Sequence, residues 1–272
     1  TGVEEIPVLD KNGNPKTRSD GSIRTKKVKQ KELQIKYDWV GFKKYKRVVN
    51  DQEYQDAAKF TFIYVIISVF VEIILGLFLA FLFNRRIYGR GFMRSLMILP
   101  IFATPFAIGF MFFTILFEIS GPLAWMGIPF LSNHNWAPFS VMLVDIWQWT
   151  PFCFLVFLAA LQGIPDDLIE AATLDTKSAY KIWTSVILPL LQPIIVLVIL
   201  LRVDESAKLY DYIASLTKGG PGTATQSVSF LVFNKAFKMN DFGYASAGSF
   251  LMLIVVMVFV MLFFTRLRKT YE

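Results

Sequence analysis

The chain of 272 residues is too apolar for an ordinary soluble domain, with 54% hydrophobic residues, 18% charged residues and a mean hydropathy of +0.49. Its net charge of +7 does not indicate nucleic-acid binding, because the many basic residues near the start are mixed with acidic ones and no aromatic RNA-binding motif accompanies them. The single cysteine, Cys153, excludes an internal disulfide and a cysteine metal cage, so the composition indicates a membrane protein.

The first 57 residues divide at about residue 37. Residues 1–37 contain the turn dipeptides Asn12-Gly13 and Asp20-Gly21, which suit a short hairpin or an exposed loop. Residues 38–57 place aromatic side chains among lysines, a pattern typical of an amphipathic helix at the membrane interface. We therefore expect a tail or hairpin followed by an interfacial segment.

Five apolar runs are long enough to cross a bilayer, whose hydrocarbon core takes about 20 helical residues. None alternates with a period of two residues, so helices are expected rather than a β-barrel. The fourth run carries Pro189 and Pro193, which predicts a kink or an earlier start within the charged residues before it. The runs are Ala58 to Phe83, Phe92 to Phe117, Phe139 to Gly163, Ser185 to Leu201 and Ser246 to Thr265.

The distribution of basic residues predicts the orientation. The connector after the first run, Asn84 to Gly91, carries Arg85, Arg86 and Arg90 without an acid, and the basic residues Arg266, Arg268 and Lys269 follow the last run. By the positive-inside rule both lie in the cytoplasm, which places residues 164–184 inside and the tail 1–57 outside. We expect an all-α, polytopic membrane helical bundle over residues 58–269, with a sixth span upstream of Thr1 to complete an even number.

A charged stretch, DDLIEAATLDTKSAYKIW (166–183), separates the third and fourth runs. Pro165 followed by two aspartates is typical of a helix start, because carboxylates there favour the exposed amide groups. After Thr176 the chain can turn, and Ser178 is placed to cap a second helix. Such a helix-turn-helix on the cytoplasmic side could rest on the bilayer or insert into a cytoplasmic partner, and physical reasoning alone favours neither.

Three blocks of sequence resemble the membrane-spanning permease subunits of ABC importers. GIPDDLIEAATLDTKSAYKIWTSVILPLLQP is similar to the EAA loop of that family, with Thr176 standing where the family usually has glycine. LYDYIASLTKGGPGTATQSVSFLVFNKAFKMNDFGYASA resembles the segment before the last span of the carbohydrate class, and WVGFKKY with the span that bears Glu72 resembles its earlier half. Together the blocks cover nearly everything from Trp39 to Lys269 and point to maltose-type and polysaccharide-type subunits. The EAA positions are Glu170, Ala171, Ala172, Asp175, Leu188 and Pro189.

The resemblance implies a transport subunit rather than an enzyme, moving a sugar across the bacterial inner membrane by alternating access. The expected cargo is an oligosaccharide, neutral or uronate-containing. Implied partners are a second homologous permease in a heterodimer, two ATPase subunits and an extracytoplasmic sugar-binding protein, besides membrane lipid. No cofactor or metal is expected in this chain. Since it lacks GxxxxGK[ST], ATP and Mg would be bound by the partner ATPase.

By the same resemblance, residues 164–184 form a cytoplasmic coupling loop that contacts the ATPase. Leu168 and Tyr180 would hold this loop to the span below. The expected contact residues are Glu170, Ala171, Ala172, Leu174, Asp175 and Thr176.

Candidates for the sugar path are polar and aromatic residues at membrane depth or just beyond, because such residues within a membrane are usually functional. They are Asp145, Trp147, Gln148, Trp149, Asp204, Glu205, Lys208, Tyr210 and Asp211. The alternative interpretation is that the two tryptophans form an interfacial belt and the charges pair with one another. Glu72 is expected to be a buried acid in helix packing, and Lys208 with Arg202 would suit an acidic oligosaccharide such as a uronate.

Other classes of protein fit the sequence less well. A secondary transporter would need ion-coupling residues or internal repeats, and only Glu72 and Asp145 lie well inside the runs. A membrane enzyme would need a catalytic cluster, and the only histidine, His134, lies in a loop without a second imidazole and is expected to be solvated. Within the ABC class, the alternative is a permease for another solute, such as a polyamine or an amino acid.

Overall fold

The computed structural model describes residues 3–7, 25–29, 41–85 and 88–271, and the chain divides into two units, Thr1–Gly41 and Phe42–Glu272. In the first unit, β1 (Val3–Pro7) pairs antiparallel with β2 (Thr25–Lys29). The two turn dipeptides at positions 12–13 and 20–21 lie outside the described residues.

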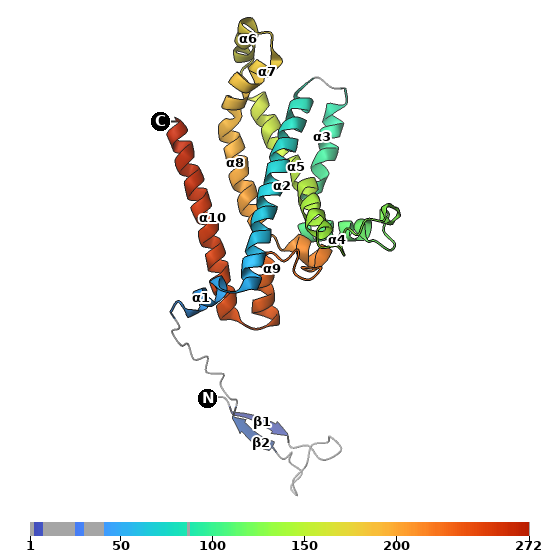
Figure 1. Ribbon diagram of the computed structural model, residues 1–272, viewed down its shortest axis with the longest axis vertical. Coiled ribbons are helices and arrows are strands. Elements are labelled where there is room, and N and C mark those ends of the chain that lie inside the picture. Colours follow the sequence, from blue (N-terminus) through green and yellow to red (C-terminus); the bar gives the residue numbers. More distant parts are fainter. Residues whose placement is uncertain (1–2, 8–24, 30–40, 86–87, 272) are drawn as a thin grey trace. The chain divides into compact units, whose positions relative to one another are not determined.

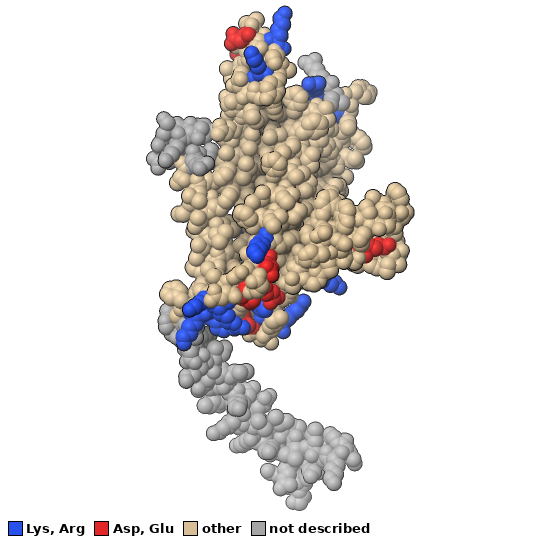
Figure 2. Space-filling view, viewed as in Figure 1, with Lys and Arg blue, Asp and Glu red and all other residues tan. Residues whose placement is uncertain are grey.

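The second unit is a bundle of long helices (Figure 1). Four are long and apolar enough to cross a membrane. On the face shown in Figure 2, charged atoms gather toward two ends and leave an uncharged belt between them. The predicted all-α membrane bundle is therefore confirmed. Three of the four are α2 (Gln52–Asn84), α5 (Trp136–Gln162) and α10 (Phe242–Tyr271). The fourth is one continuous helix of three parts, which are α7 (Ala179–Ile182), the π-helical turn η3 (Trp183–Ile187) and α8 (Leu188–Ala207).

The second expected span is not one straight helix. The run Phe92 to Phe117 forms α3 (Arg90–Ile98) with the 3-10 turn η1 (Leu99–Phe102), and then α4 (Pro105–Leu116), with a bend of 100° between them. The break follows from local chemistry, because proline cannot donate a backbone hydrogen bond and Thr104 caps α4 by accepting from the amide of Ala107. This run is thus a broken span or a re-entrant segment.

The expected interfacial segment 38–57 is also divided. Within it, α1 (Lys43–Val49) is a separate short helix, whereas residues 52–57 already belong to α2. The division occurs at Asp51, whose carboxylate accepts from the amide of Glu53 at 3.1 Å and so begins a new helix.

The end of the bundle where α2 begins is held by contacts between distant parts of the sequence. Helix α1 packs against α10 there, close to α9 (Val228–Phe233) and the π-helical turn η5 (Asn234–Lys238) (Figure 1). Asp241 lies 3.3 Å from Nζ of Lys44 and 2.8 Å from Nη1 of Arg47. Tyr244 donates its hydroxyl hydrogen to Asp51 at 2.7 Å, so the start of α2 is joined to the start of α10.

The centre of the bundle is the packing of α2 along α5 and α8. A buried cluster of aliphatic and aromatic side chains fills the space between these helices, including Val69, Phe154 and Val198. Gly76 lets α2 approach α5 closely, because a Cβ atom there would lie 2.6 Å from Cβ of Cys153 and 3.0 Å from its backbone. The remaining elements are α6 (Asp166–Asp175), η2 (Ala124–Met126) and η4 (Ile213–Thr217).

Replacing Gly76 by alanine should force α2 and α5 apart. We expect Gly76→Ala to destabilise the folded protein by about 1–3 kcal/mol, the usual cost of overpacking a close contact. Gly91→Ala is the matched control, because a Cβ atom at Gly91 would meet nothing within 4 Å. The measurement is the melting temperature of each variant in the same detergent, and equal values for both variants would contradict the close approach.

The contact of α1 with α10 should depend on pH. The pKa of Asp241 lies below its ordinary value, chiefly because the amide of Tyr244 donates to its carboxylate, with further help from Lys44. A lowered pKa means that the charged form stabilises the folded state at neutral pH. This stabilisation declines as pH falls below about 3.9, the ordinary aspartate pKa.

We therefore expect the wild type to lose more thermal stability between neutral pH and pH of about 3 than Asp241→Asn does. Asp56→Asn is the control, because Asp56 is half-exposed and makes only local contacts on α2. An identical loss in the wild type and Asp241→Asn would contradict this role of Asp241.

Candidate functional site

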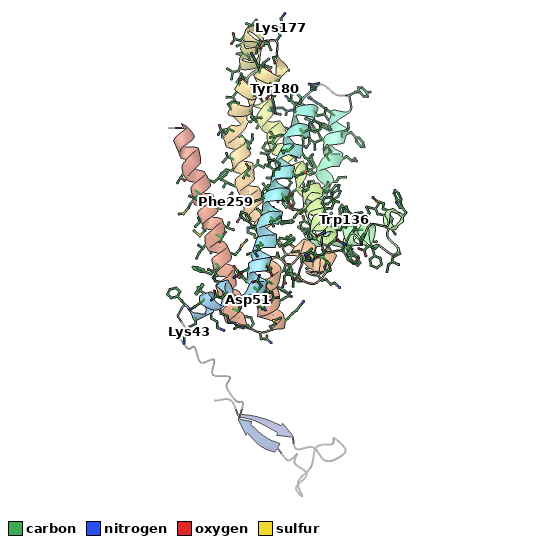
Figure 3. All side chains as sticks on the ribbon, in the orientation of Figure 1. Lys43, Asp51, Trp136, Lys177, Tyr180 and Phe259 are labelled. Carbon is green, nitrogen blue, oxygen red and sulfur yellow. The ribbon has the colours of Figure 1, made fainter. Side chains whose placement is uncertain are left out.

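A charged helix-turn-helix projects from one end of the bundle (Figure 1). Helix α6 begins at Asp166 after Pro165, and Ser178 accepts a hydrogen bond from the amide of Lys181 to start the next helix, as the sequence predicts. Lys177 and Tyr180 lie at this end, whereas Lys43 and Asp51 lie at the other (Figure 3). We call residues 164–184 the α6–α7 segment.

The α6–α7 segment presents most of the predicted contact residues to its surroundings. Glu170, Ala171, Leu174 and Asp175 are exposed, and Leu174 is 88% exposed although it is apolar. Ala172 is buried and Thr176 is half-buried, so these two residues face the chain itself.

The predicted role of Leu168 and Tyr180 in holding this segment to the span below is wrong. Tyr180 is 76% exposed and Leu168 is 46% exposed. Ile169 and Ala172 form the inward face of α6 instead, because residues three apart lie on the same side of a helix.

A buried ionic cluster joins the three central helices. Arg202 on α8 donates from Nε to Glu72 on α2 at 2.6 Å, and from Nη2 to Asp145 on α5 at 3.1 Å. The same Nη2 lies 2.9 Å from the hydroxyl of Ser206, and the guanidinium carbon lies 4.6 Å from the centre of the Trp149 ring. None of the three charged side chains is more than 3% exposed. The prediction that Glu72 is a buried acid in helix packing is confirmed.

The suggestion that Arg202 and Lys208 suit an acidic sugar stays a prediction, and in the structure both cations have acidic partners. Arg202 is already paired with two carboxylates inside the bundle. Nζ of Lys208 lies 2.7 Å from Asp204 and 3.9 Å from Glu205, and its hydrogen bond to Asp204 raises the pKa of Lys208. The charges at the end of α8 therefore pair with one another, as the alternative interpretation proposes.

A polar cavity of about 40 Å³ lies beside the ionic cluster. Tyr64, Arg202, Ser206 and Tyr212 contribute to its wall. Several sugar-path candidates also line it, namely Asp145, Trp149, Glu205, Lys208, Tyr210 and Asp211. The structure thus brings together residues from α2, α5, the end of α8 and the loop after it.

The other sugar-path candidates lie outside the wall of the cavity. Trp147 is 42% exposed and packs against Phe112, which fits an interfacial position. Gln148 donates to the carbonyl of Ala103 and accepts from the hydroxyl of Tyr212, so it connects the broken span to the loop after α8. Asp204 is the partner of Lys208.

Sequence reasoning missed Tyr64 and the central place of Arg202. Within the described part of the chain, neither the Tyr64 hydroxyl nor Nη1 of Arg202 has a hydrogen-bond partner, and both side chains line the cavity. An arginine in an apolar run needs an acid nearby, which is the signal that could have identified the pairing with Glu72 and Asp145. His134 is exposed, and the described residues contain no cluster of metal-ligating side chains.

The described residues thus form a membrane helical bundle with a charged helix-turn-helix at one end and a polar cavity toward the other. Residues 72–272 match the family described as the binding-protein-dependent transport system inner membrane component. The chain belongs to this family of ABC importer permeases, whose members are transport subunits rather than enzymes.

Two relatives illustrate the similarity. The chain is 36% identical over 233 residues to the trehalose/maltose transport system permease protein MalF of Thermococcus litoralis, covering 83% of this chain and 78% of that protein. It is 30% identical over 246 residues to the multiple sugar-binding transport system permease protein MsmF of Streptococcus mutans, covering 88% and 84%.

A solved structure shares the fold. It is a bacterial alginate ABC transporter in complex with an alginate pentasaccharide-bound periplasmic protein, and its matching chain gives a TM-score of 0.76 at 22% identity, covering 86% of this chain and 84% of that chain.

Breaking the ionic cluster should destabilise the bundle. Arg202→Met leaves two buried carboxylates without their cation, and we expect a loss of about 3–5 kcal/mol, as is usual when one partner of a buried pair is removed. The triple variant Glu72→Gln, Asp145→Asn, Arg202→Met removes all three charges and should recover most of that stability. Melting temperatures in detergent test this, and a triple variant no more stable than Arg202→Met would contradict the pairing.

Proposed function

We propose that this chain is a permease subunit of an ATP-driven importer that carries a sugar, and specifically an oligosaccharide, across the bacterial cytoplasmic membrane. The observation that carries the proposal is one continuous helix, Ala179–Ala207, which joins the α6–α7 segment to the polar cavity. Relatives named for trehalose, maltose and multiple-sugar transport support the sugar assignment.

The length of this helix suits transmission across the membrane. It has 29 residues, which at 1.5 Å per residue span about 43 Å, more than the hydrocarbon core of about 30 Å. One end begins within the α6–α7 segment, and the other carries Arg202 and Ser206. A movement of α6 would therefore move the single helix Ala179–Ala207, whose other end lines the cavity. The ion pairs of Arg202 would in turn move α2 and α5. Two packed arrangements of these helices would give alternating access.

The α6–α7 segment is the proposed contact with an ATPase subunit. Leu174 offers an exposed apolar side chain at the end of the bundle, flanked by the carboxylates of Glu170 and Asp175. This combination suits a cleft with an apolar floor and polar edges on a cytoplasmic partner. Ala172 and Thr176 instead support the segment from inside. Two ATPase subunits would bind ATP and Mg and supply the energy.

A second permease is expected to complete the sugar path. The cavity of about 40 Å³ is far smaller than typical ligand sites of about 300–1,000 Å³. A binding site large enough for a sugar therefore needs side chains from a second subunit. A homologous permease facing this chain in a heterodimer would provide them. An extracytoplasmic sugar-binding protein would deliver the sugar at the end of the bundle where α1 and α9 lie, opposite the α6–α7 segment.

The decisive experiment uses the complex purified with its co-purifying partners and reconstituted in lipid. We expect ATP hydrolysis to rise with the loaded binding protein in the wild type, and Glu170→Lys to reduce this stimulation at least about tenfold, since a charge reversal at a contact costs more than about 1.4 kcal/mol. Arg90→Glu is the matched control, because it reverses an exposed charge outside the α6–α7 segment and away from the end proposed for the binding protein.

Two results would contradict the proposal. One is the absence of any ATPase among the co-purifying proteins. The other is a Glu170→Lys complex that assembles and is stimulated as strongly as the wild type, which would show that the α6–α7 segment is only a surface helix.

A further inference from the structure

The charges that line the polar cavity are mostly acidic. Three acidic residues line it, Asp145, Glu205 and Asp211, together with two basic ones, Arg202 and Lys208. Each cation is also bonded to an acid that is not part of the lining, so acids outnumber bases around the cavity. A negative field lowers the local concentration of anions and favours neutral or cationic ligands.

Both cations already have acidic partners in the structure. Arg202 is 1% exposed, and its charge is matched by Glu72 and Asp145. Nζ of Lys208 is held by Asp204 at 2.7 Å and lies 3.9 Å from Glu205. Among the described residues, no basic side chain forms an ion pair with Asp211, whose side chain is exposed. A carboxylate on the ligand would therefore be repelled by Asp211, whose negative charge is not neutralised by an ion pair among the described residues.

The same wall is well suited to a hydroxyl group. Glu205 and Asp211 are exposed and line the cavity, so their carboxylates can accept hydrogen bonds. The partly buried Tyr210 also lines it and offers a hydroxyl that can donate. A ligand hydroxyl both donates and accepts, so it can bond to a carboxylate and to Tyr210 at once. The volume of about 40 Å³ is far below the ~300–1,000 Å³ of typical ligand sites, so it admits a hydroxyl group rather than a sugar ring.

We infer that this cavity makes the permease selective for neutral saccharides and against uronates. A neutral sugar places one hydroxyl beside Glu205 and Asp211, whereas a uronate places a negative charge beside those acids. The inference rests on the proposed function and names its substrate class. The likeness to the alginate transporter does not oppose it, because at 22% identity that likeness concerns the fold alone.

The test is equilibrium binding of labelled trisaccharides to the complete complex in nanodiscs, without the binding protein so that its own selectivity is removed. The probes are neutral (maltotriose, cellotriose and mannotriose) and acidic (trigalacturonate and trimannuronate). At an ionic strength of about 0.01 M, we expect at least one neutral probe to bind and every uronate to bind at least about tenfold more weakly than it. At about 1 M, where charges are screened within about 3 Å, the ratio should fall by more than half.

The double variant Glu205→Gln, Asp211→Asn should also reduce the ratio at low salt, and Asp56→Asn should leave it unchanged. A uronate that binds as tightly as the best neutral probe in the wild type would overturn the inference, as would a tenfold ratio that does not respond to salt. If a uronate stimulates ATP hydrolysis through the binding protein, the importer function stands and only the selectivity fails. If no saccharide binds or stimulates hydrolysis, the proposed sugar transport itself fails.

Discussion

The arrangement of the central helices depends on the ion pairs of Arg202 with Glu72 and Asp145. An unpaired charge at membrane depth is costly, so each of these groups needs the other two. Apolar packing between membrane helices is weakly directional, because lipid tails are as apolar as the side chains. Ion pairs are directional, and the three charges come from α8, α2 and α5. Satisfying all of them selects one register among the three helices, and that register forms the polar cavity.

The helix that carries Arg202 is less uniform at its other end. The π-helical turn η3 (Trp183–Ile187) and Pro193 both lie between the α6–α7 segment and Arg202. Prolines and π-helical turns interrupt the regular hydrogen bonds of a helix and are common points of bending. The ionic cluster thus fixes the cavity end of the helix, while the backbone nearer the α6–α7 segment can bend. In the proposed function, this division would let the helix follow a partner at the α6–α7 segment while the ionic cluster keeps its arrangement.

What the sequence predicts well is local or depends on hydropathy. The helix start at Asp166 and the cap at Ser178 follow from neighbouring residues, and the long spans follow from runs of apolar side chains. Hydropathy did not reveal the break before Pro105, because it counts apolar residues and ignores the cap at Thr104. Nor could it pair Glu72 with Arg202, 130 positions away, since their contact depends on how three helices pack. The inward orientation of Ala172 is likewise set by tertiary contacts.

The resemblance in fold to an alginate transporter shows why substrate chemistry has to be argued from side chains. A TM-score of 0.76 at 22% identity means that the backbones agree where most side chains differ. In this chain the cavity is built on shared helices, but its charge is set by a few residues at the end of α8, including Glu205 and Asp211. Replacing these two acids by amides would change the local charge by two without moving a helix. The charge around the cavity can therefore differ between two permeases that share one backbone, because a few side chains set it.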